Sequence, residues 1–188
     1  MNADLAKQKP LFAFSVYIQI HADCLLTVGQ EICHVLDASF SEEGFDGREF
    51  NRTYGLIWLW VLGAYEVIRT MDAASSCFSA ELSTRISRYK KNIAKLRIPF
   101  SKQEKRGRKV YVDAEPSVSS MDCRQKDMGF SVNGDVIYSR DLYGQFHQLI
   151  HGITPQQIIQ RLEDTYGEKT SNTTSSRSAG DSIGGRPM

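Results

Sequence analysis

The longest apolar run in this chain is the ten-residue stretch 56–65 (LIWLWVLGAY), which ends at Glu66. It is about half as long as a helix that crosses a bilayer. In the surrounding segment, from residue 46 or 48 to about residue 78, helical spacing places apolar side chains on nearly every side, which is typical of a helix at the centre of a bundle. The sequence therefore predicts a mainly α fold, a bundle of four or five helices, with no membrane span.

Two neighbouring helices are expected to pack on the central one. Residues 11–38 keep apolar side chains at helical spacing, and although residues 12–20 also alternate as in a strand, the longer pattern favours a helix. Residues 79–96 carry one apolar and one basic stripe, and Pro99 is expected to end this helix. Residues 39–47 are rich in acid and glycine and predict a loop.

A small β-hairpin insertion is expected before the penultimate helix. In the segment 130–138 (FSVNGDVIY), Asn133 and Gly134 lie between alternating apolar residues, which is a strong hairpin signal. Residues 109–112 (KVYV) predict a further short strand, and the stretch between the two is irregular.

Two helices should close the domain. The first is expected from residue 139 or 140 to just before Gly152, and the second begins at Thr154, where TPQQ matches a capping box. The segment after residue 166 has almost nothing to bury. The predicted organisation is an N-terminal arm at 1–10, a helical domain at 11–166 with a β-hairpin excursion at about 108–138, and a disordered tail at 167–188.

The composition indicates an ordinary folded chain. Among 188 residues, 23 Lys and Arg balance 22 Asp and Glu. The N-terminus lacks the pattern of a secretory signal, and the four cysteines lack CxxC spacing, so we expect a cytoplasmic protein. There is no glycine-rich phosphate loop, GxSxG turn or paired-carboxylate motif. His147 and His151 have zinc-ligand spacing but no further ligands nearby, so no metal or other cofactor is predicted.

The charge is distributed unevenly along the chain. Residues 85–109 hold eleven basic side chains and one acid, Glu104, which gives a local charge of +10 in a chain of net charge +1. Such a cluster attracts phosphates, so RNA or another polyanion is the expected partner. An acidic protein, or the acidic loop of a second copy, would satisfy the same charges. The residues expected to bind nucleic acid are Arg85, Arg88, Lys91, Lys95, Lys102, Lys105, Arg106, Arg108 and Lys109.

Arg140 and His147 form a candidate catalytic pair. They lie seven residues apart, close to two helical turns, so both side chains can share one face of a helix. A histidine can act as general base or acid, and an arginine can hold a phosphate. Together they could cleave RNA without a metal ion.

In this segment the chain resembles HEPN-domain proteins, helical bundles whose ribonuclease members carry an Arg, often followed by a polar residue, and a His after four to six positions. Here the polar residue is Asp141, and six residues intervene. The resemblance implies a homodimer in which two Arg-His pairs face each other and RNA is cut by attack of its own 2′-hydroxyl. The helix that bears Glu66 is similar to the central helix of such bundles, and Glu66 could orient Arg140 or His147 across the bundle.

Each of these assignments has an alternative. Arg140 can cap a turn or pair with Asp135, while His147 packs on the bundle. Glu66 can pair with Arg69, three residues further on. The protein would then be a non-catalytic binding module whose basic face engages nucleic acid or an acidic protein. A third alternative is a subunit of a larger assembly, marked by an exposed apolar patch on the second helix.

Overall fold

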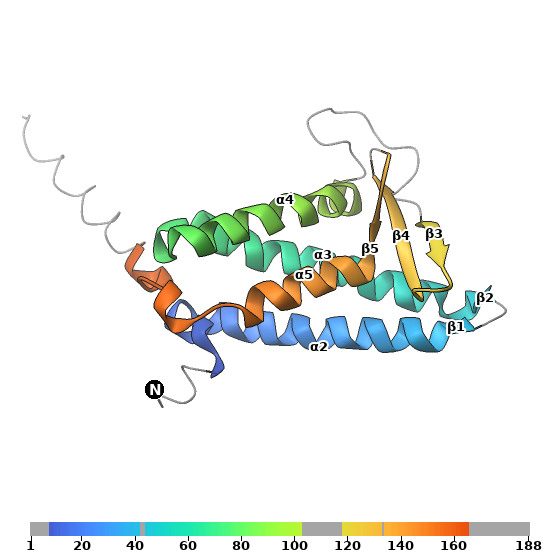
Figure 1. Ribbon diagram of the computed structural model, residues 1–188, viewed down its shortest axis with the longest axis horizontal. Helices are drawn as coiled ribbons and strands as arrows, with labels where there is room; N and C mark the ends of the chain where they lie inside the picture. Colours follow the sequence, from blue (N-terminus) through green and yellow to red (C-terminus); the bar gives the residue numbers. More distant parts are fainter. Residues whose placement is uncertain (1–7, 42–43, 103–117, 133, 166–188) are drawn as a thin grey trace, which may run out of the picture.

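The computed structural model describes residues 8–41, 44–102, 118–132 and 134–165. Most of this part belongs to the helices α2 (Val16–Ser39), α3 (Phe50–Ala73), α4 (Ala80–Lys102) and α5 (Ser139–His151). α3 packs against α2 and α4, and α5 lies against the same two helices (Figure 1). The prediction of a mainly α bundle with a small β-hairpin before the last described helices is confirmed. Within the described ranges, no helix has the length and apolar character needed to cross a membrane.

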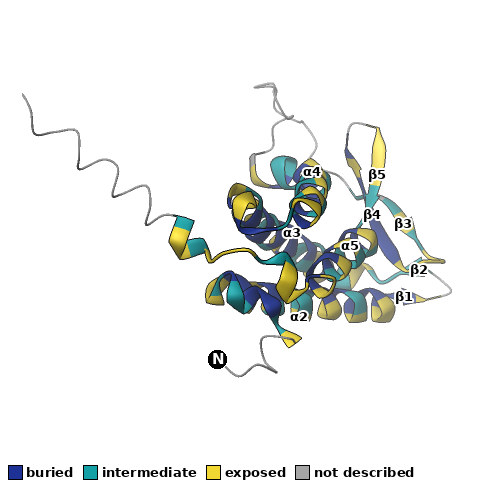
Figure 2. Ribbon diagram, turned by 60° about the vertical axis from the view of Figure 1, so that its left-hand side comes forward, coloured by how far each residue is buried: buried dark blue, intermediate teal, exposed yellow. Residues whose placement is uncertain are grey.

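The hydrophobic core lies where the helices face one another (Figure 2). α3 contributes Ile57, Val61 and Ile68, each at most 1% exposed. It is not fully enclosed, however, because Trp58 and Leu59 remain 37% and 59% exposed. The expectation of a helix buried on every side is therefore met on the faces toward α2 and α4, while an outer face stays open.

α2 begins five residues later than the sequence pattern predicted. A separate 3-10 helix, η1 (Pro10–Ala13), comes first, and Ser15 then caps α2 because its hydroxyl accepts a hydrogen bond from the Ile18 N–H at 3.4 Å. The alternation over residues 12–20 does not produce a strand. The central helix is likewise preceded and followed by 3-10 turns, η2 (Gly47–Glu49) and η3 (Ser75–Cys77).

Pro99 does not end α4, which continues to Lys102. Packing explains why the helix continues past this residue. Phe100 is 8% exposed and lies edge-on to the ring of Phe130, with centroids 5.5 Å apart. Its carbonyl accepts a hydrogen bond from Trp58 Nε1 at 3.0 Å. These tertiary contacts hold the last turn of α4 against the local disadvantage of a proline.

The hairpin is confirmed and is part of a three-stranded antiparallel sheet at one end of the bundle (Figure 1). β4 (Asp127–Val132) pairs with β5 (Asp135–Tyr138), and Gly134 in the turn has a φ of +91°. β3 (Val118–Asp122) pairs with β4 in a stretch predicted to be irregular. The predicted strand at 109–112 lies outside the described residues. Within the predicted acidic loop, β1 (Phe40–Ser41) and β2 (Gly44–Phe45) form a short ladder.

The predicted last helix is interrupted after its first turn, and residues 162–165 are helical again. Gln157 Oε1 accepts a hydrogen bond from the Thr154 N–H at 3.1 Å, as in a capping box, but the turn is only the 3-10 helix η4 (Pro155–Gln157). Ile158 then forms a β-bridge with Phe78. Further on, the Leu162 N–H donates to the carbonyl of Phe14 at 3.0 Å. Residues 158–162 thus bond to other segments of the chain, and the predicted tail at 167–188 lies outside the described residues.

Candidate functional site

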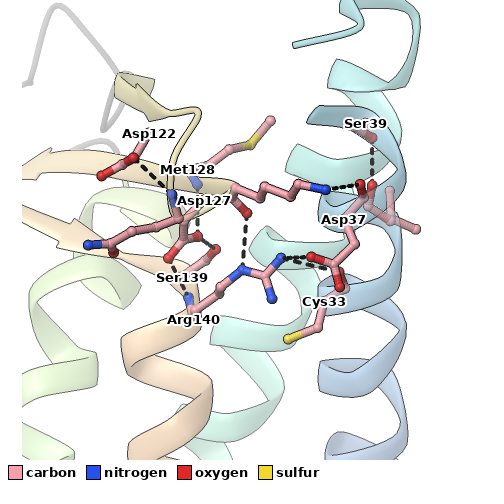
Figure 3. Close-up of polar contacts among 11 residues, drawn as sticks. Cys33, Asp37, Ser39, Asp122, Asp127, Met128, Ser139 and Arg140 are labelled. Atoms are coloured by element: carbon pink, nitrogen blue, oxygen red, sulfur yellow. Dashed lines mark hydrogen bonds and ion pairs between the residues drawn. The ribbon is translucent and has the colours of Figure 1, made fainter. Parts of the chain in front are cut away.

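A buried carboxylate holds the beginning of α5, where the predicted arginine lies (Figure 3). Asp127, the first residue of β4, is 1% exposed. It accepts hydrogen bonds from the Ser139 hydroxyl, from the Met128 N–H at 2.8 Å and from the Arg140 N–H at 3.0 Å. Tyr138 occupies the N-cap position without a side-chain cap, so Asp127 supplies the cap from the sheet.

The Arg140 side chain points away from this cap toward the end of α2 (Figure 3). Its Nη2 lies 2.7 Å from Asp37 Oδ1 and 3.4 Å from the Cys33 carbonyl, and its Nε donates to the Lys126 carbonyl at 3.0 Å. Arg140 therefore connects α5, the β3–β4 turn and α2. It binds a turn, as one alternative expected, but its acidic partner is Asp37 rather than Asp135.

Two ionisable groups in this region are affected by burial. Desolvation raises the pKa of the Asp127 carboxyl, although its three hydrogen bonds oppose the shift. Desolvation also raises the pKa of the Cys33 thiol, with Arg140 acting in the opposite direction. A thiol with a raised pKa is less nucleophilic at neutral pH, so Cys33 is structural in character.

His147 lies further along α5 in a different environment. Its ring centroid is 4.2 Å from that of His151 and 5.9 Å from that of Tyr143. Burial and the charge of His151 lower the pKa of His147. Seven residues of helix correspond to about 10 Å of rise, and no hydrogen bond or ion pair between described residues links Arg140 to His147. The structure places the two on one helix and does not bring their side chains into one constellation.

The two predicted supporting residues are also separate from this region. Glu66 accepts a hydrogen bond from Arg69 Nε at 2.7 Å and lies 3.6 Å from Arg97 Nη2, which confirms the alternative of a structural pair with Arg69. Glu66 makes no hydrogen bond or ion pair with Arg140 or His147 in the described part of the chain. Asp141 lies in the first turn of α5 with an exposed side chain.

The basic residues of α4, which include several predicted to bind nucleic acid, divide into an inward and an outward group. Two of them turn inward, toward α3. Lys90 Nζ lies 2.5 Å from a carboxylate oxygen of Asp72, and Arg97 Nη2 lies 3.6 Å from a carboxylate oxygen of Glu66. Arg88 and Lys91 are exposed and form no ion pair among the described residues, although Lys91 lies close enough to Asp72 to help lower the pKa of that carboxyl. Lys95 has one ion-pair partner among the described residues, Asp135, whose carboxylate lies 3.8 Å from Lys95 Nζ. We call Arg88, Lys91 and Lys95 the basic ridge. Lys102 is the last residue of α4, while Lys105, Arg106, Arg108 and Lys109 lie outside the described ranges.

A polar groove runs beside the basic ridge, between α4 and α5, with a volume of about 310 Å³. Arg85 donates to the Gly152 carbonyl at 3.3 Å, and Asn92 Nδ2 donates to Gln145 Oε1 at 3.1 Å. No lining residue is acidic, and the full lining is Arg85, Arg88, Tyr89, Asn92, Gln145, Gln148 and Leu149. We call this cavity the amide groove. Asn92, Gln145 and Gln148 were not among the residues predicted from the sequence. The two glutamines share one face of α5, but no sequence signal indicated that α4 lies beside them.

A larger and mainly apolar groove separates α2 from α3, with a volume of about 670 Å³. Tyr17, Leu25, Gly63 and Val67 line it together with Leu162. Tyr17 is 75% exposed. This groove borders the exposed face of α3 described above.

Comparison with protein-family models, with curated proteins and with solved structures gives no match. The HEPN resemblance therefore stays a hypothesis based on Arg140, His147 and their spacing. In the described part of the chain, no three His, Cys, Asp or Glu side chains gather as metal ligands would.

Proposed function

We propose that the protein is a non-catalytic RNA-binding module that engages the phosphate backbone with the basic ridge of α4. The observation that carries this proposal is the division of charge along the helix. Lys90 and Arg97 are paired with acids of α3, whereas Arg88 and Lys91 are exposed and form no ion pair among the described residues; Lys91 has only a longer-range attraction to Asp72. Unpaired surface cations are the groups from which binding to a polyanion gains most, through release of counterions.

The last residue of α4 and the sequence that follows it extend the same charge. Residues 102–109 add five basic side chains and one acid to the chain immediately after the ridge. RNA is favoured over an acidic protein because the ridge lies beside a groove that combines guanidinium and amide groups and lacks acids. Guanidinium groups suit phosphates, and amides suit base edges.

The catalytic alternative receives less support from the geometry. A phosphate-binding Arg140 would have to release Asp37 and the two carbonyls that it now binds. His147 would have to act about two turns away. Binding without cleavage therefore agrees better with the contacts of Arg140.

The test is fluorescence anisotropy with a labelled single-stranded RNA in EDTA, between about 50 and 200 mM salt. We expect the variant Arg88→Glu/Lys91→Glu to bind at least tenfold more weakly and with a shallower salt dependence. The control Arg48→Glu/Arg124→Glu changes the net charge equally at exposed sites outside α4 and should bind like the wild type.

Three results would contradict the proposal. Equal losses in the two variants would show that only net charge matters. Equal affinity for poly-glutamate would indicate an acidic protein partner. RNA cleavage in EDTA that disappears in His147→Ala would support the catalytic alternative, in which Arg140 and His147 form the catalytic pair.

A homodimer is also a proposal, but we place its interface on the α2–α3 groove, which contains neither Arg140 nor His147 and so differs from the facing Arg-His pairs that the resemblance implies. Leu59 lies one turn before Gly63 of this groove and is 59% exposed. The groove also contains Glu66 and Arg69, one turn apart. A two-fold axis would set Glu66 of each copy beside Arg69 of the other, which is the self-complementarity that such dimers require.

Sedimentation velocity tests this interface. Leu59→Glu should convert a dimer into a monomer, because it places a charge in the apolar contact. Val136→Glu, which changes an equally apolar side chain that is 46% exposed on β5, should leave the dimer intact. A wild-type monomer at high concentration, or a dimer that survives in Leu59→Glu, would exclude this interface.

A further inference from the structure

The amide groove between α4 and α5 differs from the basic ridge in chemistry. The ridge offers cations alone, whereas the groove has two arginines at one end and three amide side chains along its walls. A purely electrostatic surface has no need of amides held in fixed orientations. The groove is therefore suited to a ligand that carries both a negative charge and neutral hydrogen-bonding groups.

The cationic end of the groove is fixed in place. Arg85 donates to the Gly152 carbonyl at 3.3 Å, and a Cβ atom on Gly152 would lie 2.6 Å from Arg85 Nη2. The guanidinium thus rests on the glycine at the end of α5. Its neighbour in the groove, Arg88, lies one turn further along α4 and has no acidic partner among the described residues. Two guanidinium groups one turn apart can hold one phosphate.

The neutral end of the groove is also oriented. The hydrogen bond from Asn92 Nδ2 to Gln145 Oε1, at 3.1 Å, uses one donor and one acceptor of the pair. It leaves the Asn92 carbonyl as an acceptor and the Gln145 amide nitrogen as a donor. A donor beside an acceptor is the arrangement that pairs with the edge of a base. Asn92 lies four residues after Arg88, which is about 6 Å along the helix.

We infer that the amide groove binds one nucleotide of a single-stranded RNA, with its phosphate at Arg85 and Arg88 and its base edge at Asn92 and Gln145. This inference rests on the proposed RNA-binding function and adds the form of RNA that is recognised. The Watson–Crick edges of the bases in an RNA duplex are already paired, so a duplex can use the ridge but cannot offer these edges to the amides. The protein therefore discriminates single strands from duplexes through the groove.

The experiment compares one labelled RNA as a single strand and as a duplex, by anisotropy with the full chain at fixed salt. We expect Asn92→Ala/Gln145→Ala to lower the affinity for the single strand about tenfold and to leave duplex affinity within twofold. Gln30→Ala/Asn51→Ala, which removes exposed amides from α2 and α3, should change neither. Arg85→Lys keeps the charge and loses the planar fork, so it should weaken single-strand binding several-fold.

The results separate this inference from the proposed function. If the groove variant binds the single strand like the wild type, or loses both forms of RNA equally, the groove assignment is wrong. The ridge function still stands if Arg88→Glu/Lys91→Glu weakens both forms. If the wild-type protein binds neither form, both proposals fail. Thermal unfolding of each variant shows whether a loss of binding reflects a loss of fold.

Discussion

The guanidinium of Arg140 lies 2.7 Å from the carboxylate of Asp37, a residue 103 positions earlier in the chain. The Arg140 side chain is 27% exposed and that of Asp37 is 57% exposed, so the ion pair itself lies close to solvent. The Arg140 side chain, unlike that of Asp37, has further hydrogen-bond partners among the described residues: it donates to the Cys33 carbonyl of α2 in a partly buried place and to the Lys126 carbonyl of the β3–β4 turn near solvent.

This difference predicts unequal effects of mutating the two partners. Arg140→Ala should lower the free energy of unfolding by about 2 kcal/mol, because it also leaves the carbonyls of Lys126 and Cys33 without this donor. Asp37→Asn should cost less than about 1 kcal/mol, as is usual for an exposed ion pair. Urea unfolding monitored by circular dichroism measures both. Equal costs would mean that the ion pair dominates and that the carbonyl contacts contribute little.

The Asp127 cap predicts a larger loss of stability. Asp127→Ala leaves the Ser139 hydroxyl and the N–H groups of Met128 and Arg140 without their acceptor in a buried place, at a cost of about 3 kcal/mol. Asp127→Asn should cost about half as much, since the amide oxygen can still accept from Ser139 and Met128. The same urea titration separates the two variants. An alanine variant as stable as the asparagine variant would contradict the capping role.

Two glycines predict opposite effects of alanine. A Cβ atom on Gly29 would lie 2.2 Å from the ring of Tyr143, so Gly29→Ala should destabilise the fold by about 1–3 kcal/mol. Gly144 in α5 has open space at the same position, and Gly144→Ala should stabilise the helix by about 0.5–1 kcal/mol. Thermal melts of the two variants give the comparison. A stabilising Gly29→Ala would show that Tyr143 can move without cost.

His147 predicts a pH dependence of stability. Its pKa in the folded protein lies below the unfolded value of 6.5, so the unfolded chain binds the proton more tightly. Stability should therefore fall as the pH decreases through 6.5 and should level off below the folded pKa. His147→Gln should reduce this slope, measured as the urea midpoint at several pH values. His34→Gln removes an exposed imidazole of α2 as a control, and an equal change in both variants would contradict the assignment.

Local features of the fold were predictable from the sequence, while long-range contacts were not. The α5 helix and the β4–β5 hairpin follow from periodicity and a turn signal, and the structure confirms both. β3 (VSSMD) lacks a clear alternation and gains its partner only from β4. Pro99 does not end the helix as the local preference of proline predicts, because Phe130 and Trp58 contact Phe100 and stabilise the turn that follows.

The same division applies to the candidate site. Glu66 and Arg69 are three residues apart in the sequence, so their pairing could be predicted from helical spacing. The partners of Arg140 come from a helix and a turn elsewhere in the chain, and no spacing rule relates them. The amide groove likewise needs α4 and α5 side by side, which only the folded chain supplies.

The hydrogen bond from the Leu162 N–H to the Phe14 carbonyl joins the two ends of the described domain. During synthesis, the segment that begins α2 leaves the ribosome long before the residues that complete its surroundings. The hydrogen bond between Arg140 and Asp37, which joins α5 to α2, also forms only after residue 140 has been synthesised. Native closure of this domain therefore waits until residue 162 has been synthesised, and until then the apolar side of α2 lacks part of its cover.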